Sequence, residues 1–255
     1  MANIHQRNFI VRWSELDANG RFGLEHYLRY LIETAYDWGE SLDLGHQAYE
    51  RLGIYWLIRE TELLVECFPR HTEEISLMIW MNQWQRVRGV RSFRITNQEG
   101  VLYAQGSQKI VVMDVHTLRP TKLADDVIGR FRLENPEQVV VRDLLRTPPT
   151  SQILYKKERF VNWTDLDAQN HVNNVVYVNY ARDLVNEYLN TQSENAIKTP
   201  SRYVHIEYQS PAIWQEGLTL SLFENGHDNE LKYYRIQATR PDGSPIMVCV
   251  LGVEI

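Results

Sequence analysis

The sequence predicts an α+β protein in which one structural unit occurs twice, each unit being an antiparallel sheet wrapped around a long helix. Three observations predict it: an internal repeat, a helical pattern at the same place in each copy, and a series of strand-like segments after each helix. A chain of 255 residues can form one large domain or two small ones. The repeat favours two.

The repeat lies in the first part of each half. "RWSELDANGRFGLEHYLRYLIETA" from Arg12 aligns without a gap with "NWTDLDAQNHVNNVVYVNYARDLV" from Asn162. A second match joins "SFRITNQEG" to "YYRIQATRPDG", and a period of about 150 residues is far too long for a solenoid. The identical pairs are Trp13/Trp163, Leu16/Leu166, Asp17/Asp167, Ala18/Ala168, Tyr27/Tyr177 and Tyr30/Tyr180.

Apolar residues at helical spacing follow the repeated motif in both copies. Steps of three and four residues place them on one face of an amphipathic helix. The first copy has Leu24, Leu28, Leu31, Ala35 and Trp38, and the second has Val175, Val178, Ala181, Val185 and Tyr188. The sequence therefore predicts one long central helix in each unit.

Alternating or aromatic-rich segments after each helix predict about four antiparallel strands per unit, with turns at "NQEG" and "RPDGSP". They are "YWLIRETELLVEC", "EISLMIWMNQW", "VRSFRITN" and "VLYAQGSQKIVVMDV", then "RYVHIEYQS", "LTLSLFEN", "LKYYRIQAT" and "PIMVCVLGVEI". A polar, charged segment that closes with Pro148 and Pro149 predicts a linker. We expect domains at residues 1–130 and 153–255, joined by 131–152.

The composition excludes several classes of function. A formal net charge of −6 without a long lysine or arginine block argues against nucleic acid as a partner. No apolar run of 18 residues and no signal-peptide core occur, so we expect a cytoplasmic protein that does not insert into a membrane. The two cysteines, Cys67 and Cys249, lack paired spacing, and no zinc, serine-hydrolase or phosphate-loop motif occurs. We therefore expect no metal and no cofactor.

A polar cluster precedes the second helix. Asn173 or Asn174 suits the N-cap, where a side-chain oxygen accepts a hydrogen bond from an unpaired backbone N–H. A cap alone does not require Asp167, Gln169 and His171, which alternate before it. In an extended segment these three side chains would lie on one side of the backbone.

The first copy serves as an internal control for this cluster. It has Asp17, Asn19, Arg21, Gly23 and Leu24 at the equivalent positions. Because the aspartate occurs in both copies, part of its role is expected to be structural. The histidine occurs only in the second copy. We therefore expect acid–base chemistry in the second half, with His171 at its centre.

The segment "DLDAQNHVNNVVY" resembles the acyl-acyl-carrier-protein thioesterases of plastids and bacteria, whose pattern is close to D-L-D-x-N-x-H-V-N-N-x-x-Y. "IYWLIRETELLVECFPRHTEEISLMIWM" and "IVVMDVHTLRP" are similar to further segments of that family. The resemblance implies a tandem, or double, hotdog fold. It also implies hydrolysis of a fatty acyl-carrier-protein thioester to free fatty acid and acyl carrier protein, which ends chain elongation in fatty acid biosynthesis.

Carried over by position, Asp167 and His171 match the family's catalytic aspartate and histidine. Two positions depart from the pattern. Gln169 stands where the family usually has Asn, with Asn170 next to it. Pro211 and Ala212 of "IEYQSPAIW" stand where the family has Glu or Glu-Cys. Glu207 is a poor substitute, because four strand residues span roughly 13 Å.

The resemblance suggests a role for each residue. His171 acts as base or orients water, Asp167 holds the imidazole, and Gln169 contacts His171 or the thioester. Backbone N–H groups at Asn173 and Asn174 polarise the carbonyl with the helix dipole. Aromatic residues of the first half are expected to line the acyl-chain pocket or to pack in the core: Trp56, Trp80, Trp84 and Phe93.

Acyl carrier protein is the implied partner, and because it is acidic, "WQRVRGVRSFR" and "YKKER" are candidate docking surfaces. Three alternatives stay open. The first is an acyl-coenzyme A thioesterase. The second is a catalytically weak acyl-binding hotdog protein, as Pro211 and Ala212 suggest. The third, a hotdog hydratase, fits less well, because those resemble D-x-N-P-x-H. A homodimer is an open option, and the sequence does not determine acyl chain length.

Overall fold

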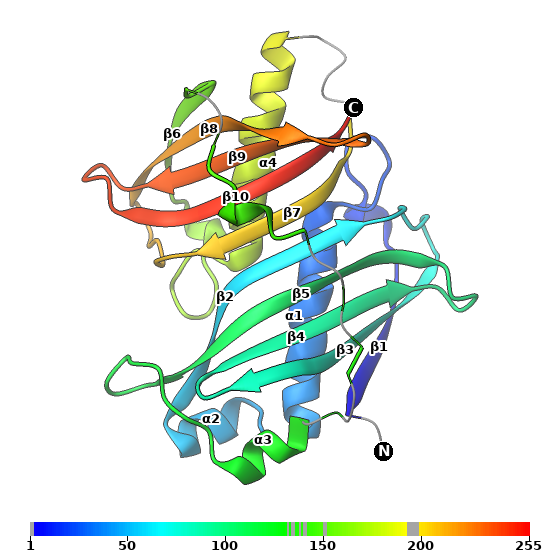
Figure 1. Cartoon of the computed structure of the whole chain (residues 1–255), viewed down its shortest axis with the longest axis vertical. Helices are drawn as coiled ribbons and strands as arrows, with labels where there is room; N and C mark the ends of the chain where they lie inside the picture. Colours follow the sequence, from blue (N-terminus) through cyan, green and yellow to red (C-terminus); the bar gives the residue numbers. More distant parts are fainter. Residues whose placement is uncertain are drawn as a thin grey trace. The chain divides into compact units, whose positions relative to one another are not determined.

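A computed structural model describes residues 3–131, 133, 136–137, 139, 142–149, 152–192 and 199–255. The chain divides into two compact units, Met1–Val141 and Arg142–Ile255. Residues 132, 134–135, 138, 140–141 and 150–151 of the expected linker lie outside the described part of the chain. Each unit is considered by itself below (Figure 1).

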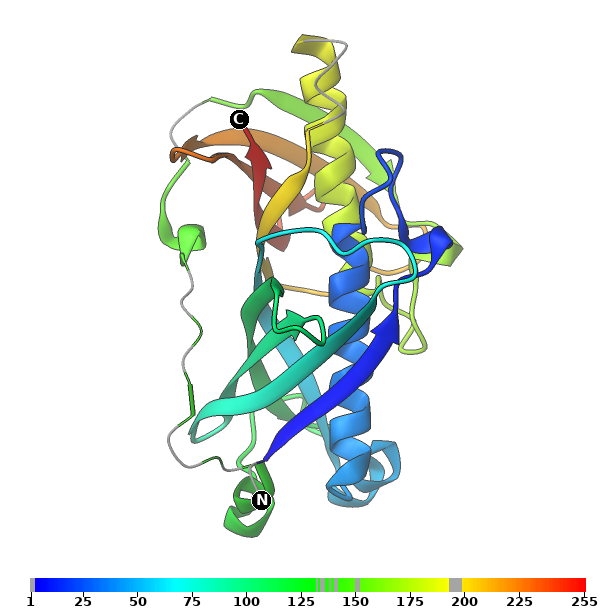
Figure 2. The same ribbon diagram turned by 90° about the vertical axis from the view of Figure 1, so that its right-hand side faces the viewer.

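The first unit is an antiparallel sheet with one long helix against it. The strands lie in the order β1-β3-β4-β5-β2. Figure 2 shows α1 running along the face of this sheet. The elements are β1 (Ile4–Ile10), η1 (Trp13–Glu15), α1 (Leu24–Ser41), α2 (His46–Leu52), β2 (Ile54–Val65), β3 (Glu74–Gln85), β4 (Arg88–Thr96), β5 (Leu102–Asp114) and α3 (Asp125–Phe131).

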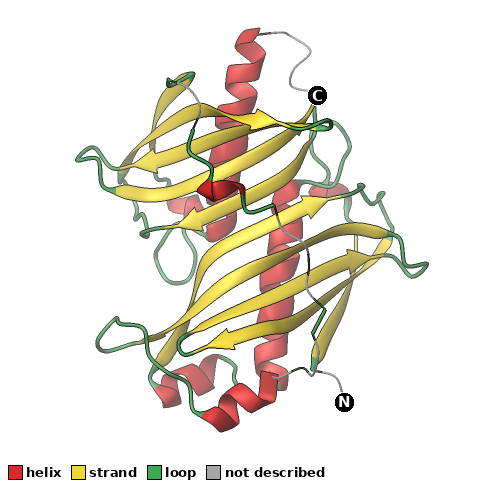
Figure 3. Ribbon diagram, in the orientation of Figure 1, coloured by secondary structure: helices red, strands yellow, loops and turns green. Residues whose placement is uncertain are grey.

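The second unit has the same plan, with strand order β7-β10-β9-β8-β6 and the helix α4 against the sheet (Figure 3). Strand, 3₁₀ turn, helix and four further strands follow one another as in the first unit. The elements are η2 (Leu144–Arg146), β6 (Tyr155–Phe160), η3 (Trp163–Asp165), α4 (Asn174–Gln192), β7 (Ser201–Tyr208), β8 (Gly217–His227), β9 (Leu231–Thr239) and β10 (Pro245–Glu254).

Four strands follow each central helix, as predicted, and each unit has a fifth strand that was not predicted. The additional strands, β1 and β6, precede the long helix and form an edge of their sheet. Both were missed because they are short and polar: "YKKERF" has four charged residues out of six. An edge strand tolerates such a sequence because one of its sides faces water, and its charges discourage pairing with other chains.

The central helices bury most of the face that their periodicity predicted, whereas Ala35 and Tyr188 are only half-buried. In α1, Leu24, Leu28, Leu31 and Trp38 are at most 4% exposed. In α4, Val175, Val178, Ala181 and Val185 are at most 1% exposed. Burial of each large aliphatic side chain stabilises the fold by roughly 1.5–3 kcal/mol, so the packing of helix against sheet forms the core of each unit.

Among the described residues, no helix is both long enough and apolar enough to cross a membrane.

Candidate active site

The second unit's central helix begins at the asparagine pair that the sequence singled out. Asn173 is the N-cap: its Oδ1 accepts a hydrogen bond from the N–H of Val175 at 2.9 Å. Asn174 is the first helical residue. This confirms the predicted cap and places the positive end of the helix dipole directly after the motif.

The motif before the cap forms a tight turn. Leu166 pairs with Val172 across it. The N–H of Asp167 donates to the C=O of His171 at 2.9 Å, and the N–H of Asn170 donates to the C=O of Asp167 at 3.0 Å. Asn170 has a φ of 60°, a left-handed conformation that asparagine tolerates better than most residues. The expectation that an extended segment aligns Asp167, Gln169 and His171 was therefore wrong.

The carboxylate of Asp167 stabilises this turn. Its Oδ1 accepts the backbone N–H of Gln169 at 2.9 Å. In the first unit, Asp17 holds the same turn by accepting the N–H of Asn19 at 2.8 Å and of Arg21 at 3.1 Å. The shared role explains why the aspartate occurs in both copies. Within the described chain, no hydrogen bond joins Asp167 to the imidazole of His171.

The turn presents two side chains that the fold itself does not use. Gln169 is exposed and His171 is half-buried. Neither side chain forms a hydrogen bond with any residue that the structure describes. An imidazole and a primary amide at a helix N-terminus are thus available to a bound substrate and a water molecule.

The helix start offers one backbone donor where the sequence suggested two. The N–H of Asn173 donates to the C=O of Asp165 at 2.9 Å, so it is already used. The N–H groups of Val175 and Val176 both bond to Asn173. The N–H of Asn174 has no acceptor among the described residues. It is therefore the candidate donor to a developing oxyanion.

The buried carboxylate of Asp165 stabilises the segment that leads into this turn. Asp165 is 9% exposed and accepts hydrogen bonds from the N–H of Asn162 at 2.7 Å and the hydroxyl of Tyr180 at 2.6 Å. Burial and then the hydrogen bond to Asp165 raise the pKa of Tyr180, so the phenol remains a donor. The guanidinium of Arg159 lies 3.9 Å from the centre of the Tyr180 ring.

The first unit repeats this support with Glu15, which accepts the hydroxyl of Tyr30 at 2.6 Å and the N–H of Arg12 at 2.8 Å. This carboxylate–phenol pair was not predicted from the sequence. A signal for it was present, because an acidic residue and a tyrosine are separated by the same interval in both copies. The pair therefore belongs to the folding of the unit, not to chemistry in one half.

The segment after β7 lies directly against the motif. The N–H of Val172 donates to the C=O of Ala212 at 2.9 Å. The N–H of Ala212 in turn donates to the hydroxyl oxygen of Tyr177 at 2.9 Å. Ala212 is fully buried. The position where the resemblance expects a carboxylate or thiol is thus beside the motif, but it carries only a methyl group.

Two tyrosines connect this segment and β7 to the start of α4. Burial raises the pKa of Tyr177 to about 12, so its hydroxyl stays protonated at neutral pH. The hydroxyl of Tyr208 donates to the C=O of Asn174 at 3.1 Å. Hydrogen bonds of this kind fix the first helical turn relative to the sheet.

Arg240 holds the other side of the same segment. Its guanidinium donates to the Oγ of Ser210 and to the C=O of Pro211, each at 2.8 Å, and forms an ion pair with Glu216. Trp163 and Trp214 pack edge to face at 5.4 Å beside the motif, although both are more than half exposed. The segment beside the motif is thus fixed by the contacts of Arg240, and two partly exposed tryptophans pack next to it.

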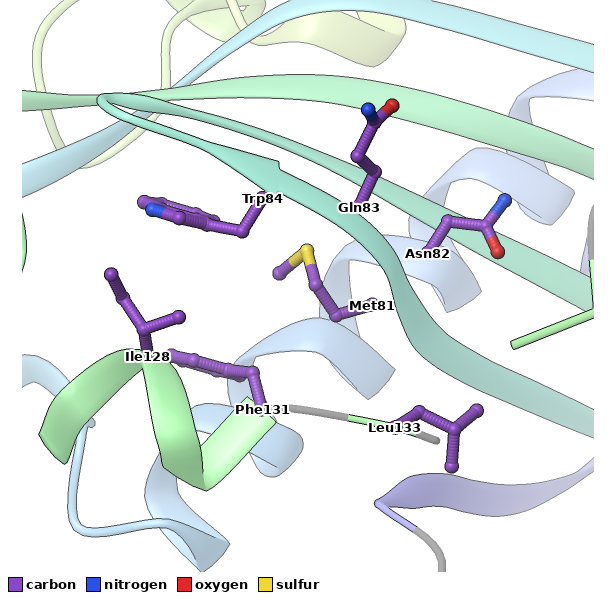
Figure 4. Close-up of a pocket in the computed structure, with 7 residues that line it drawn as sticks. All are labelled: Met81, Asn82, Gln83, Trp84, Ile128, Phe131 and Leu133. Atoms are coloured by element: carbon purple, nitrogen blue, oxygen red, sulfur yellow. The ribbon is translucent and has the colours of Figure 1, made fainter. Parts of the chain in front are cut away.

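The first unit contains a pocket of about 420 Å³ between β3 and α3. Figure 4 shows Trp84 facing Ile128 and Phe131 across it, with Met81 between them. The pocket is lined by Met81, Asn82, Gln83, Trp84, Ile128, Phe131 and Leu133. Its volume lies in the range of small-molecule sites, and its lining is mostly apolar.

The four aromatic residues expected near an acyl chain separate into two pairs. Trp84 lines the pocket, and Trp56 packs edge to face against both Trp84 and Phe131 at 5.6 and 5.7 Å. Trp80 and Phe93 are at most 4% exposed and belong to the core. The indole N–H of Trp80 donates to the C=O of Glu137 at 2.9 Å.

Comparison with known families gives two matches that follow the two units. Residues 2–131 match the acyl-ACP thioesterase N-terminal domain, and residues 151–237 match the acyl-ACP thioesterase C-terminal domain. A palmitoyl-acyl carrier protein thioesterase of Gossypium hirsutum is 22% identical over 189 residues, which are 69% of this chain and 46% of that protein. The chain spans about half the length of the curated relatives it matches.

Solved structures show the same fold at low sequence identity. A 12:0-ACP thioesterase from Umbellularia californica has a TM-score of 0.80 at 17% identity, covering 99% of this chain and 94% of that chain. An acyl-ACP thioesterase from Bacteroides thetaiotaomicron has a TM-score of 0.76 at 16% identity, covering 99% and 98%. These likenesses confirm the double hotdog fold. With both halves matched by its domain models, this chain belongs to the acyl-ACP thioesterase family.

Proposed function

We propose that the protein hydrolyses fatty acyl thioesters of acyl carrier protein to free fatty acid and acyl carrier protein, and so ends chain elongation. One observation carries this proposal. His171 is the part of the motif that the first copy lacks and that the fold does not use, and it stands beside the start of α4. The family membership and the relatives' names support the same reaction.

The proposed reaction needs a base and an oxyanion donor. His171 takes a proton from water as the water oxygen attacks the thioester carbon. The N–H of Asn174 and the amide of Gln169 donate hydrogen bonds to the carbonyl oxygen as it becomes negative. The C–S bond then breaks, and the imidazolium returns the proton to the departing thiolate.

Asp167 acts in this proposal as a positioning residue. Its carboxylate fixes the turn through the N–H of Gln169, and that turn sets where Gln169 and His171 point. Ala212 contributes only its backbone, which fastens the motif to Tyr177. The lack of a carboxylate or thiol at Ala212 favours slow turnover. If turnover is negligible, the protein binds acyl groups without hydrolysing them.

The test is hydrolysis by purified protein of matched acyl-carrier-protein and acyl-coenzyme A substrates. His171→Ala is expected to lower the rate by about 10²- to 10⁴-fold. His227→Ala is the control, since His227 lies at the exposed end of β8 in the same unit. An unchanged rate in His171→Ala contradicts the assignment, and faster turnover of the coenzyme A substrate contradicts the carrier-protein donor.

We further propose that the pocket of the first unit accepts the acyl chain. Its support is the mostly apolar lining and a volume suited to a small ligand. Docking of acyl carrier protein, a cytoplasmic location and a homodimer stay predictions. Of the two basic segments, "YKKER" is the weaker docking candidate, because Lys157 and Arg159 already pair with Glu187 and Asp183 of α4.

A further inference from the structure

Two loops at one end of the first unit carry exposed cations. Arg86 and Arg88 lie at the turn between β3 and β4, and Arg119 and Lys122 lie between β5 and α3. No side chain of these four forms an ion pair or hydrogen bond with a residue in the described part of the chain. In this respect they differ from Arg94, which pairs with Glu137.

The two loops are direct neighbours because both bond to Val112 of β5. The N–H of Val112 donates to the C=O of Val87 at 3.0 Å, and its C=O accepts the N–H of Thr121 at 2.9 Å. The two loops that carry the four cations therefore lie side by side at one end of the sheet, although they come from separate segments of the chain.

Large aliphatic side chains are exposed at the same end of the sheet. Leu118 is 66% exposed and Val115 is 38% exposed, both in the loop after β5. The N–H of Val115 donates to the C=O of Gly53 at 3.0 Å, which brings Leu52, itself 43% exposed, to the same end. We call these three residues, together with Arg86, Arg88, Arg119 and Lys122, the basic apolar end.

The loop that carries Leu118 is held in one conformation. Asp114 Oδ1 accepts the N–H and hydroxyl of Thr117 at 2.7 and 2.8 Å, and its backbone C=O accepts the N–H of Leu118 at 3.0 Å. Leu118 itself has a φ of 53°, which residues with a side chain rarely adopt. An exposed leucine in such a conformation is more consistent with a functional contact than with packing.

Carboxylates near this surface are mostly engaged elsewhere. The hydrogen bonds from Thr117 keep the pKa of Asp114 below its usual value, and this carboxylate faces its own turn. Asp126 lies 4.0 Å from Arg130, one helical turn along α3. Asp125 and Glu50 are the remaining acidic residues of the adjoining helices. Cations therefore dominate the two loop tips.

We propose that the basic apolar end docks the protein on the surface of an anionic lipid bilayer. The four cations meet the lipid phosphates, while Leu118 and Val115 enter the headgroup boundary. Such docking is peripheral and requires no membrane-spanning segment. The whole chain carries a net charge of −6, so long-range attraction to an anionic bilayer comes from this local surface, which also fixes the orientation.

Two other occupants fit less well. A second copy of the chain in a two-fold contact would bring like charges face to face. A protein partner needs about 800 Å² per side with side chains anchored in pockets, whereas Leu118 and Val115 lie on a loop that projects from the sheet (Figure 1). The inference does not depend on the proposed hydrolysis.

Co-sedimentation of the full chain with phosphatidylcholine vesicles and with mixed phosphatidylcholine–phosphatidylglycerol vesicles tests the proposal. Binding to the mixed vesicles alone, weakened by salt, is the expected result. The double variant R86E/R119E is expected to lower the partition coefficient by at least about 25-fold, since each of the two cations contributes about fivefold. Leu118→Asn is expected to lower it severalfold without loss of thermal stability, because asparagine accepts the left-handed conformation.

Matched controls are Arg29→Glu on the exposed face of α1 and Val101→Ser at the opposite turn of the sheet, where Val101 is 44% exposed. Neither is expected to affect vesicle binding. Equal binding to both vesicle types, or equal losses in the controls, overturns the proposal. Loss in Trp214→Ser but not in Leu118→Asn assigns vesicle binding to the second unit instead. If acidic carrier protein binds and R86E/R119E abolishes only that binding, the surface docks a protein.

Discussion

At the scale of single residues, the two copies of the motif separate folding from chemistry. Asp17 and Asp167 hold equivalent turns, and Glu15 and Asp165 accept the hydroxyls of the equivalent tyrosines Tyr30 and Tyr180. These contacts occur in both units because each unit needs them to fold. His171 has no counterpart, and Arg21 stands in its place in the first copy. Comparison within one chain thus singles out His171 as the residue most specific to the proposed reaction.

Gln169 is the residue whose replacement is most informative. Its backbone N–H fixes the turn, whereas its side chain is exposed and contacts no described residue. Gln169→Ala keeps the backbone bond, so we expect normal folding and, if the amide meets the oxyanion, a rate loss of about 10²-fold or more. Single-turnover hydrolysis measures the effect.

Gln169→Asn is the matched comparison, because it restores the asparagine that the family resemblance predicts and keeps Asn170, whose left-handed φ of 60° closes the turn. Its rate is expected to equal or exceed that of the original chain. A lower rate would indicate that the longer amide is required here. An unchanged rate in Gln169→Ala would remove the amide from the mechanism.

The hydroxyl of Tyr180 is expected to contribute to stability. Tyr180→Phe removes a 2.6 Å hydrogen bond to the buried carboxylate of Asp165. Because one partner of a charge-assisted bond is lost, the free energy of unfolding should fall by about 1.5–3 kcal/mol. Urea denaturation measures it, and Tyr36→Phe on the exposed side of α1 is the control. Equal losses in both variants would contradict the role of the pair.

At the scale of elements, periodicity located both long helices and eight of the ten strands. The expected strand segment at "EISLMIWMNQW" became β3, Glu74–Gln85, and the segment at "LKYYRIQAT" became β9, Leu231–Thr239. These segments succeed because alternating apolar residues pack against a central helix. The edge strands β1 and β6 were not predicted, because they lack a clear alternation of apolar residues. Their pairing rests on backbone hydrogen bonds.

Turn geometry inside the motif could not be predicted either. Alternation of Asp167, Gln169 and His171 suggested an extended segment, but a side-chain hydrogen bond and the left-handed Asn170 close a turn instead. Aspartate and asparagine offer the backbone local partners that compete with regular structure. The periodicity of apolar and polar residues does not reveal such local hydrogen bonds.

The cap of α4 provides a prediction at this scale. Asn173→Ala removes the acceptor for the N–H of Val175 and should lower the free energy of unfolding by about 1 kcal/mol. It should also lower hydrolysis, because the N–H of Asn174 loses its fixed direction. Asn173→Ser keeps a capping oxygen and is expected to restore both properties. Thermal denaturation together with the hydrolysis rate distinguishes a cap from a side chain that contacts substrate.

At the scale of the whole molecule, the mostly apolar pocket and the motif belong to different units of one chain. Duplication of a fold allows such a division, because one copy retains the chemistry and the other can change its interior. The first unit has a mostly apolar pocket between β3 and α3, and the second has the accessible histidine.

The length of the released fatty acid is expected to follow the pocket. Ile128→Trp places a larger side chain opposite Trp84 and should shift the products toward shorter chains while keeping the chemistry intact. Mass spectrometry of fatty acids from cells that overexpress the variant measures the shift. Ile153→Trp, at a site that is 49% exposed in the second unit, is the control. An unchanged chain length with unchanged activity would place the acyl chain elsewhere.

The sequence by itself determined the duplication and the helix-and-sheet plan of each unit, and it singled out Asp167, Gln169, His171 and Asn173 as candidate site residues. These follow from local patterns, namely period, repeat and cap chemistry, which are properties of short segments. Only the tertiary structure decided that Asn174 supplies the available backbone donor, that Ala212 lies against the motif, and that separate loops join in the basic apolar end. These facts depend on contacts between segments distant in sequence, which no local pattern encodes.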